Sequence, residues 1–483
     1  MIGMSLLAYF FPIPIAVFMI VYVLSWLLRS IRFSYFLLRS YPAFLRSIKV
    51  PWQQKIEADP ELKKRSNEVC HVILAATYKE EYETLARALA MLAKSTFPHD
   101  QIIYVLATEA RDHDHAQAVA KQLRAKFGKE FHDFIVTEHP ADITGEVKGK
   151  GGNISWAGRV VRDVVNQRGL DPNKVLVTSI DSDHRLHPEY LSALTYTYLN
   201  DPNPLKSSYV SVALFFNNVW DVPSSVRFIH FSSTFWMMAT SVWTSRLHNV
   251  MTQTQTLAAL TKTDFYSPIS IVEDGHQYWR SLFTFGKDYS VKMVLMPVYS
   301  DAVMHETFLG TLREQYLQRR RWHYGISDFP YVVSHLWFQK KLRSTRAIID
   351  FLRHWEGHFS LATSSVMLGV VGWIPLQSTA LTSTVLGTHF RSLYIGSLRY
   401  ALLGILISAV ISISLVPPRF PGKPWSRLYL LWDYLLLPIQ IVASIVLAAS
   451  LPSIEAHTRL MLGKYLGSFH VTYKAVSTKT TLD

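Results

Sequence analysis

The sequence has little cysteine and no visible internal repeat. Cys70 is the one cysteine among 483 residues, which excludes an internal disulfide and fits a reducing compartment. The basic residues are dispersed and no nucleic-acid-binding module accompanies them, so we expect no nucleic acid partner. The first apolar stretch also lacks the basic start and the small-residue cleavage site of a signal peptide, which indicates a retained membrane anchor.

Long apolar runs lie at both ends of the chain, and charged, mixed sequence lies between them. About 20 apolar residues suffice to cross a bilayer as a helix. The candidate spans are residues 6–28, 359–374, 400–415 and 428–451. Residues 31–45 mix arginines with aromatic and aliphatic side chains, as an interfacial helix does. The pattern predicts an integral, multi-pass membrane protein with a soluble middle part.

Basic residues decide the predicted orientation, because they gather on the cytoplasmic side of membrane segments. The residues that follow the first span are Arg29, Arg32, Arg39, Arg46 and Lys49. The middle domain is therefore expected in the cytoplasm, with the N-terminus outside and the basic loop 417–427 inside. The last span would then leave a basic C-terminal tail outside. Either one span is re-entrant or interfacial, or there is one span more.

The middle part alternates short apolar runs with helical patterns. The expected strands are 69–76, 102–107, 134–137 and 175–180, with helices between them, and 210–229 is also expected to be strand-like. This alternation predicts a mostly parallel, doubly wound α/β sheet. The chain is divided into an anchor with an interfacial helix (1–49), the α/β domain (50–330), interfacial helices (331–358), transmembrane helices (359–456) and a tail (457–483).

Two carboxylates follow the last of these four strands. Asp181 and Asp183 flank Ser182, and ligands of α/β sheets bind at the carboxyl ends of strands. Paired carboxylates there suit a hard divalent cation that takes its other ligands from water and substrate phosphates. A simple turn is the alternative, because Asp and Ser are ordinary turn residues.

Two more segments could face an anionic ligand. The segment 77–80 follows the first strand, and a strand–helix junction offers free N–H groups to an anion or a nucleotide; a helix cap is the alternative. The segment 148–153 joins two lysines to glycines that allow close approach of a diphosphate. A flexible, solvated loop would have the same composition.

Two further segments are suited to acid–base chemistry and to sugar binding. Glu273 and Asp274, expected at the end of a strand or loop, offer a candidate general base, although acidic pairs are common in turns and caps. Gln318, Arg321 and Trp322 share one face at helical spacing. They offer an amide, a guanidinium for a diphosphate and an indole plane for a sugar ring. A basic helix lying on anionic lipid is the alternative.

In this order the segments resemble the family 2 glycosyltransferases with a membrane domain. This group includes cellulose, chitin, hyaluronan and poly-N-acetylglucosamine synthases and ceramide glucosyltransferase. Asp181-Ser182-Asp183 matches a DxD motif, Glu273-Asp274 the end of a TED motif, and residues 318–322 a QxxRW motif. The resemblance covers residues 69–322. It implies a Rossmann-like GT-A fold and inverting transfer from a nucleotide-diphosphate sugar, most often UDP-linked.

The resemblance also implies roles for the site residues. Asp183 and Asp181 would bind Mg²⁺ or Mn²⁺, and Asp274, beside Glu273, would deprotonate the acceptor hydroxyl. The residues implied to bind the donor are Thr77, Tyr78, Glu80, Glu109, Lys148, Asp181, Gln318 and Arg321, and those implied at the acceptor are Trp322 and Asp274.

The sequence departs from the family pattern at three places. An acidic pair usually follows the second strand, where this chain has Glu109 and, further on, Asp112. Val272 replaces a common threonine, and the segment 76–80 lacks the usual proline and asparagine.

We predict a processive synthase that extends a β-linked polysaccharide at the membrane and passes it through its own helices. The alternative is a non-processive enzyme that glycosylates a lipid acceptor, such as a polyprenyl phosphate or a ceramide-like lipid. A non-catalytic receptor or transporter would lack the catalytic carboxylates, which are all in place. Zinc is disfavoured, because the histidines at 113, 115, 184 and 187 have no further ligands at a suitable spacing.

Overall fold

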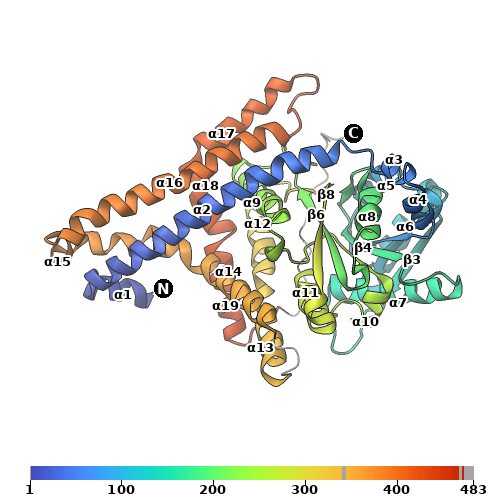
Figure 1. The fold of residues 1–483 in the computed structure, drawn as a ribbon, viewed down its shortest axis with the longest axis horizontal. Coiled ribbons are helices and arrows are strands. Elements are labelled where there is room, and N and C mark those ends of the chain that lie inside the picture. Colours follow the sequence, from blue (N-terminus) through green and yellow to red (C-terminus); the bar gives the residue numbers. More distant parts are fainter. Residues whose placement is uncertain (1, 340–343, 467–469, 471, 473–483) are drawn as a thin grey trace.

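The computed structural model describes residues 2–339, 344–466, 470 and 472. Within them, an α/β domain lies beside a group of long helices (Figure 1). Its sheet has eight strands in the order β3-β2-β1-β4-β7-β6-β8-β5. The strands are β1 (Cys70–Ala76), β2 (Ile102–Glu109), β3 (Asp133–His139), β4 (Val175–Asp181), β5 (Arg185–Leu186), β6 (Ser207–Leu214), β7 (Gln253–Thr256) and β8 (Ser290–Tyr299).

The sheet is parallel in one half and mixed in the other. Strands β3, β2, β1 and β4 are parallel, as predicted. Strand β7 pairs antiparallel with both β4 and β6, and β5 pairs antiparallel with β8. The prediction of strand-like structure over 210–229 is wrong beyond Leu214, because a helix, α9 (Ser224–Ser241), begins directly after Pro223, whose fixed φ suits the start of a helix.

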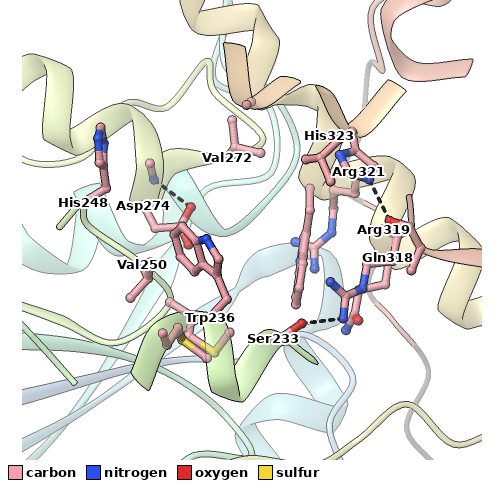
Figure 2. Close-up of a pocket in the computed structure, with 18 of the residues that line it drawn as sticks. Ser233, Trp236, His248, Val250, Val272, Asp274, Gln318, Arg319, Arg321 and His323 are labelled. Carbon is pink, nitrogen blue, oxygen red and sulfur yellow. Dashed lines mark hydrogen bonds between the residues drawn. The ribbon is translucent and has the colours of Figure 1, made fainter. Parts of the chain in front are cut away.

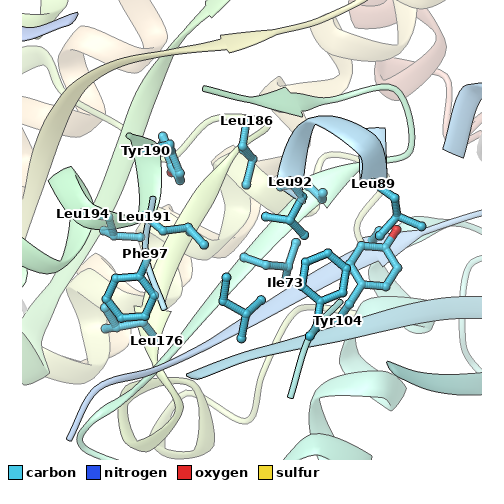
Figure 3. Packing of buried hydrophobic residues seen from close by; sticks show 14 of the residues in the cluster. Ile73, Leu89, Leu92, Phe97, Tyr104, Leu176, Leu186, Tyr190, Leu191 and Leu194 are labelled. Carbon is cyan, nitrogen blue, oxygen red and sulfur yellow. The ribbon is translucent and has the colours of Figure 1, made fainter. Parts of the chain in front are cut away.

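Both faces of the parallel half are buried, because neighbouring side chains of a strand point to opposite faces. Ile73 and Tyr104 pack on one face with helices α5 (Tyr82–Leu92), α6 (His113–Phe127) and α8 (Tyr190–Leu199) (Figure 3). Val72 and Val105 pack on the other face with α7 (Lys150–Gln167) and α10 (Leu257–Lys262). The carboxyl ends of β1, β2 and β4 are therefore fixed by a core on each side.

Among the described residues, four helical segments are long and apolar enough to cross a membrane: Pro12–Ile48, Thr345–Gln377, Val385–Leu415 and Leu437–Met461. The number equals the number of predicted spans, and the bounds differ. The first segment is longer than predicted, because the expected interfacial helix continues the span as one helix, α2 (Pro12–Ile48). Its Pro12 and Pro14 lie in the first turn, where no intrahelical N–H bond is lost.

Helix α2 runs beside α16 (Val385–Leu415) and α9 (Figure 1). The approach to α16 is close, since a Cβ on Gly404 would lie 3.0 Å from the hydroxyls of Ser30 and Ser34. The remaining α-helices are α1 (Ile2–Phe10), α3 (Trp52–Glu57), α4 (Pro60–Ser66), α11 (Glu273–Phe285), α12 (Phe308–His323), α13 (Asp328–Phe338), α14 (Thr345–Gly369), α15 (Thr379–Thr382), α17 (Leu431–Leu435), α18 (Leu437–Leu447) and α19 (Ser450–Met461).

The α/β domain contacts the long helices through α9 and α12. Helix α12 packs on α18 and α19. Asp433 on α17 accepts hydrogen bonds from Ser224 (2.6 Å) and from Arg227 Nη2 (3.1 Å) on α9. The predicted interfacial segment 331–358 contains the end of α13 and the start of α14. Of the predicted tail 457–483, residues 467–469, 471 and 473–483 lie outside the described residues.

Candidate active site

A large cavity begins at the carboxyl ends of β1, β2 and β4 and continues between the long helices. Its volume is about 1570 Å³, whereas small-molecule sites usually enclose about 300–1,000 Å³. Eleven of the twelve sequence-predicted site residues line it: Thr77, Tyr78, Glu80, Glu109, Asp181, Asp183, Glu273, Asp274, Gln318, Arg321 and Trp322. Lys148 is the exception, because its side chain is exposed.

Asp181 and Asp183 form an acidic pair beside His184. Among the described residues, these three are the one group whose ligand atoms come within 4.8 Å of one another. Nδ1 of His184 accepts the N–H of Asp181 (3.2 Å), so its Nε2 carries the proton and faces the Asp181 carboxylate at 3.6 Å. The two carboxylates could therefore hold a divalent cation, with His184 orienting Asp181.

Asp183 is buried and held in place by the segment that follows β8. Its Oδ2 accepts the N–H of Asp301 (2.8 Å), and Asn217 donates to the Asp301 carboxylate (2.7 Å). Asp183 is 3% exposed, whereas the side chain of Asp181 is 38% exposed. One carboxylate is thus fixed and the other is open to the cavity.

Glu80 connects the loop after β1 to the acidic pair. Its carboxylate accepts hydrogen bonds from the hydroxyls of Thr77 (2.8 Å) and Ser182 (3.0 Å) and from the N–H of Tyr78. Burial raises the pKa of Glu80, although these three donors lower it in part. The geometry gives Glu80 a positioning function in addition to its place in the cavity wall.

The predicted donor-binding residues after β1 and β2 gather around Tyr78. The guanidinium of Arg111 lies 4.4 Å from the centre of the Tyr78 ring and pairs with the carboxylate of Glu109. Asp112, the other candidate at this place, accepts the N–H of Lys79 (2.9 Å), a residue with a φ of 68°. Such a φ is costly outside glycine, and the bond to Asp112 stabilises it.

A different lysine from the predicted one reaches the carboxylates. The segment expected as a flexible loop is instead the first turn of α7, which begins at Lys150. Nζ of Lys150 donates to Asp181 and lies 3.5 Å from Oε1 of Glu273. Gly151 has no room for a Cβ, because the carbonyl of Ser267 packs directly against it. This close approach brings the segment before Glu273 over the start of α7.

Glu273 and Asp274 occupy the first turn of α11, and not the end of a strand or loop. Carboxylates are favourable there because of the helix dipole. Burial raises the pKa of Glu273 to about 7 and also raises the pKa of Asp274, while Lys150 lowers both. Burial lowers the pKa of Lys150, but Asp181 and Glu273 outweigh it and raise the pKa. Proton-accepting groups with raised pKa values suit general base chemistry near neutral pH.

Helix α12 brings its basic motif to the same cavity, opposite Asp274 (Figure 2). Oε1 of Gln318 is buried and, within the described residues, has no hydrogen-bond partner. Burial lowers the pKa of Arg321, and the nearby carboxylates Glu273, Asp181 and Asp274 raise it in part. Four carboxylates and several cations thus surround one space, an arrangement suited to a metal-bound, anionic substrate.

Sequence reasoning missed Arg319 and Lys150. Arg319 lies 4.4 Å from the centre of the Trp322 ring and donates to the Ser233 hydroxyl (2.7 Å) (Figure 2). Burial lowers its pKa to about 9. Residue 319 is an i, i+3 neighbour of Trp322, so helical spacing could have indicated this contact, but the family motif carries residues 318, 321 and 322 and leaves 319 out. Lys150 lies in the segment 148–153 that was predicted to face an anionic ligand, but the resemblance implied Lys148 as the donor-binding residue.

The far part of the cavity lies between candidate spans. Its polar and aromatic lining there comes from α2, α14 and α16 and includes Trp26, Ser30, Glu356, Ser360 and Ser397. Charged and polar side chains within membrane spans usually face a protein interior or a water-filled space. The catalytic part and the membrane part of the cavity are continuous.

A Rossmann-like mixed sheet with an acidic pair at its carboxyl edge is typical of the GT-A fold. The sequence profile described as glycosyl transferase family group 2 matches residues 176–447, which is more than half of the chain. The chain belongs to this family and is a glycosyltransferase. A comparison with curated protein sequences gives no match.

Two solved structures are similar to the chain. One is a mannosyltransferase from Pyrobaculum calidifontis in complex with GDP-Man and Mn²⁺, with 14% identity and a TM-score of 0.42 over 92% of this chain and 100% of that one. The other is S. aureus TarS in complex with UDP-GlcNAc, with 14% identity and a TM-score of 0.36 over 82% of this chain and 93% of that one.

Proposed function

We propose that this glycosyltransferase is an inverting enzyme that moves a sugar from a nucleotide-diphosphate donor, a UDP-sugar, to a growing polysaccharide. One observation carries the proposal: a single cavity joins the carboxylates Asp181 and Asp274 to the polar and aromatic lining of the candidate spans. A chain extended at Asp274 has a continuous path into the membrane region. An acceptor that stays in this path after each transfer keeps its new end near Asp274, so β-linked sugars are added repeatedly.

The proposed chemistry uses the residues around this space. Asp274 accepts the proton of the acceptor hydroxyl, whose oxygen then attacks the anomeric carbon while the bond to the diphosphate breaks. Mg²⁺ or Mn²⁺, held by Asp183 and Asp181, would neutralise charge on the diphosphate. Arg321 and Lys150 supply further positive charge for this leaving group. Trp322 provides an apolar plane for the acceptor sugar.

The donor pocket is assigned to the loop after β1 and the end of β2. Tyr78 stacked with Arg111 offers a flat surface for a base, and Thr77 and Glu109 lie beside it. In the proposed orientation this domain is cytoplasmic, the N-terminus lies outside, and the long helices cross the bilayer more than once. Basic residues in the second half of α2, such as Arg39 and Arg46, support the orientation.

A second candidate is transfer to a lipid acceptor. It is favoured by the apolar part of the same cavity, which includes Val23, Leu27, Leu361 and Leu368. A lipid chain could lie along these side chains with its head group toward Asp274. The size of the product separates the two candidates.

The test is a donor screen with the purified protein in nanodiscs and Mg²⁺ or Mn²⁺. Release of nucleotide diphosphate is measured for each sugar donor, and the product is sized on a gel. A high-mass ladder formed without added lipid acceptor supports polysaccharide synthesis. A single-sugar lipid adduct, or turnover only with added lipid, selects the second candidate.

The base is tested with Asp274→Asn. We expect about 10²–10⁴-fold lower turnover, the usual contribution of a general base, with donor binding retained. Asp163→Asn, at an exposed carboxylate on α7, is the matched control. Unchanged turnover in Asp274→Asn would refute the assignment.

A further inference from the structure

Four arginines line the cavity at the level where the α/β domain meets the candidate spans: Arg29, Arg32, Arg246 and Arg353. They come from α2, from the segment after α9 and from α14, so three parts of the chain converge. Trp26 and Trp243 line the same part of the cavity. Arginine and tryptophan at this level are typical of the boundary between water and bilayer.

Two of these cations pair directly with carboxylates, and Glu356 also acts on Arg246 at longer range. Arg29 pairs with Glu356, and Arg353 pairs with Asp350 at 3.2 Å. Within the part of the chain that the structure describes, neither Arg32 nor Arg246 has a carboxylate within 4 Å, and Nε of Arg246 is buried without a hydrogen-bond partner.

The other two guanidinium groups, those of Arg32 and Arg246, both lie against the ring of Trp243. They lie 4.4 Å (Arg32) and 4.8 Å (Arg246) from the centre of one ring, that of Trp243. Their carbons are therefore at most about 9 Å apart. Two like charges at this separation repel each other in a partly desolvated site, and an anion between them removes the repulsion. Paired guanidinium groups suit a phosphate.

Beyond the arginines the cavity wall becomes apolar. Val23, Leu27, Leu361, Leu368 and Leu398 line it. Leu368 lies 12 residues beyond Glu356 on α14, which corresponds to about 18 Å along a helix. Half of the hydrocarbon core of a bilayer is about 15 Å thick. The apolar wall is thus long enough to contact most of one acyl chain.

We infer that this part of the cavity binds an anionic phospholipid, with its phosphate between Arg32 and Arg246 and a chain along the apolar wall of α14. An amphipathic ligand matches both parts of the wall, whereas a free phosphate would leave the apolar part unused. This site is separate from the catalytic carboxylates. Its apolar wall is the one that the lipid-acceptor candidate also uses, so a lipid acceptor and the phospholipid would compete for it.

The test is an equilibrium titration of the purified full-length protein in detergent with fluorescent phosphatidic acid. Phosphatidylcholine with the same chains tests the need for an exposed anionic phosphate, and inorganic phosphate tests the need for a chain. We expect saturable binding of phosphatidic acid, much weaker binding of phosphatidylcholine, and no displacement by millimolar phosphate. Equal binding of both lipids, or full displacement by phosphate, would overturn the inference.

Arg32→Gln/Arg246→Gln is the decisive variant. Each basic residue contributes about 1 kcal/mol to binding anionic lipid, so we expect about 30-fold weaker binding. Arg246→Gln alone, expected to lose about fivefold, serves if the double variant does not fold. Arg162→Gln, at a surface arginine paired with its neighbour Asp163, should bind as the unmodified protein does. Undiminished binding by a folded Arg32→Gln/Arg246→Gln protein contradicts the inference.

Asp274→Asn separates this inference from the proposed function. The variant removes the proposed base and leaves the arginines in place, so it should still bind phosphatidic acid with unchanged affinity. Loss of turnover with intact lipid binding supports both proposals. Intact turnover with intact lipid binding refutes the base and leaves the lipid site supported.

Discussion

Replacing Lys150 by methionine tests the central charge arrangement of the site. The side chain of Lys150 is 11% exposed and that of Glu273 is 6% exposed, so little water screens their contact of 3.5 Å. Methionine keeps most of the volume and removes the charge. Lys148, two residues earlier and exposed, offers a control of the same residue type in the same segment.

The magnitude follows from the geometry. Opposite charges 3.5 Å apart interact by about 5 kcal/mol at an effective dielectric constant of about 20. Desolvation of the pair offsets part of this energy, and the contact with Asp181 is discounted because that carboxylate is 38% exposed. The remaining ion-pair energy acts on stability, whereas the effect on rate comes from the charge that Lys150 offers to the leaving group. Loss of one such preorganised group usually costs about 10²–10³-fold in turnover.

The assay is steady-state release of nucleotide diphosphate in nanodiscs, together with thermal unfolding of each variant. Lys150→Met should lose 10²-fold or more, and Lys148→Met should stay within about twofold, as surface changes usually do. Equal losses in both variants, or Lys150→Met within twofold of the unmodified enzyme, would refute the reasoning. A large fall in unfolding temperature would assign Lys150 to stability instead.

Three further predictions concern metal, pH and packing. Chelation with EDTA should abolish turnover, and added Mn²⁺ or Mg²⁺ should restore it. Asp181→Asn should need a higher metal concentration for half-maximal turnover. Turnover that survives chelation argues against a metal enzyme. Because burial raises the pKa of Glu273 to about 7, its ionisation destabilises the folded state as the pH rises from about 4.5 to about 7. Glu273→Gln should therefore raise the unfolding temperature more at pH 8 than at pH 5, and an equal change at both would count against the shift. Asp433 is 2% exposed and accepts hydrogen bonds from Arg227 and Ser224. Asp433→Ala should therefore lower the free energy of unfolding by about 3–5 kcal/mol, measured by thermal or denaturant unfolding. A loss below about 1 kcal/mol would show that water replaces the carboxylate.

The parallel half of the sheet could be predicted because its signals are local. Strands such as 102–107 are short, apolar runs between helical patterns, and both faces of the sheet are covered. Strand β7, with the sequence Gln253-Thr254-Gln255-Thr256, carries no apolar pattern. It pairs through its backbone and hydrogen bonds such as that between Thr178 and Thr254 (2.8 Å). This segment is therefore a strand because of its neighbours in the folded sheet, and its own sequence does not predict it.

The site residues could be predicted where a motif fixes them, and not where packing does. Asp181 and Asp183 directly follow a strand, so their place at the sheet edge was fixed by topology. Lys150 became a site residue because α7 begins there and Gly151 lies against Ser267. Arg319 is held by Ser233, which is 86 residues distant in the sequence. No local sequence pattern predicts a contact between residues so far apart in the chain.

The packing of α2 also constrains how the protein is made. Its Arg29 pairs with Glu356 on α14, and its closest helical neighbour is α16. α2 ends at residue 48 and α16 begins at residue 385, so a ribosome adding about 5–20 residues per second needs roughly 17–70 s between them. During that time α2 has neither α14 nor α16 to pack against, while the α/β domain is completed. Assembly of this enzyme therefore includes a late step, in which Arg29 on α2 pairs with Glu356 on α14 only after the α/β domain has been synthesised.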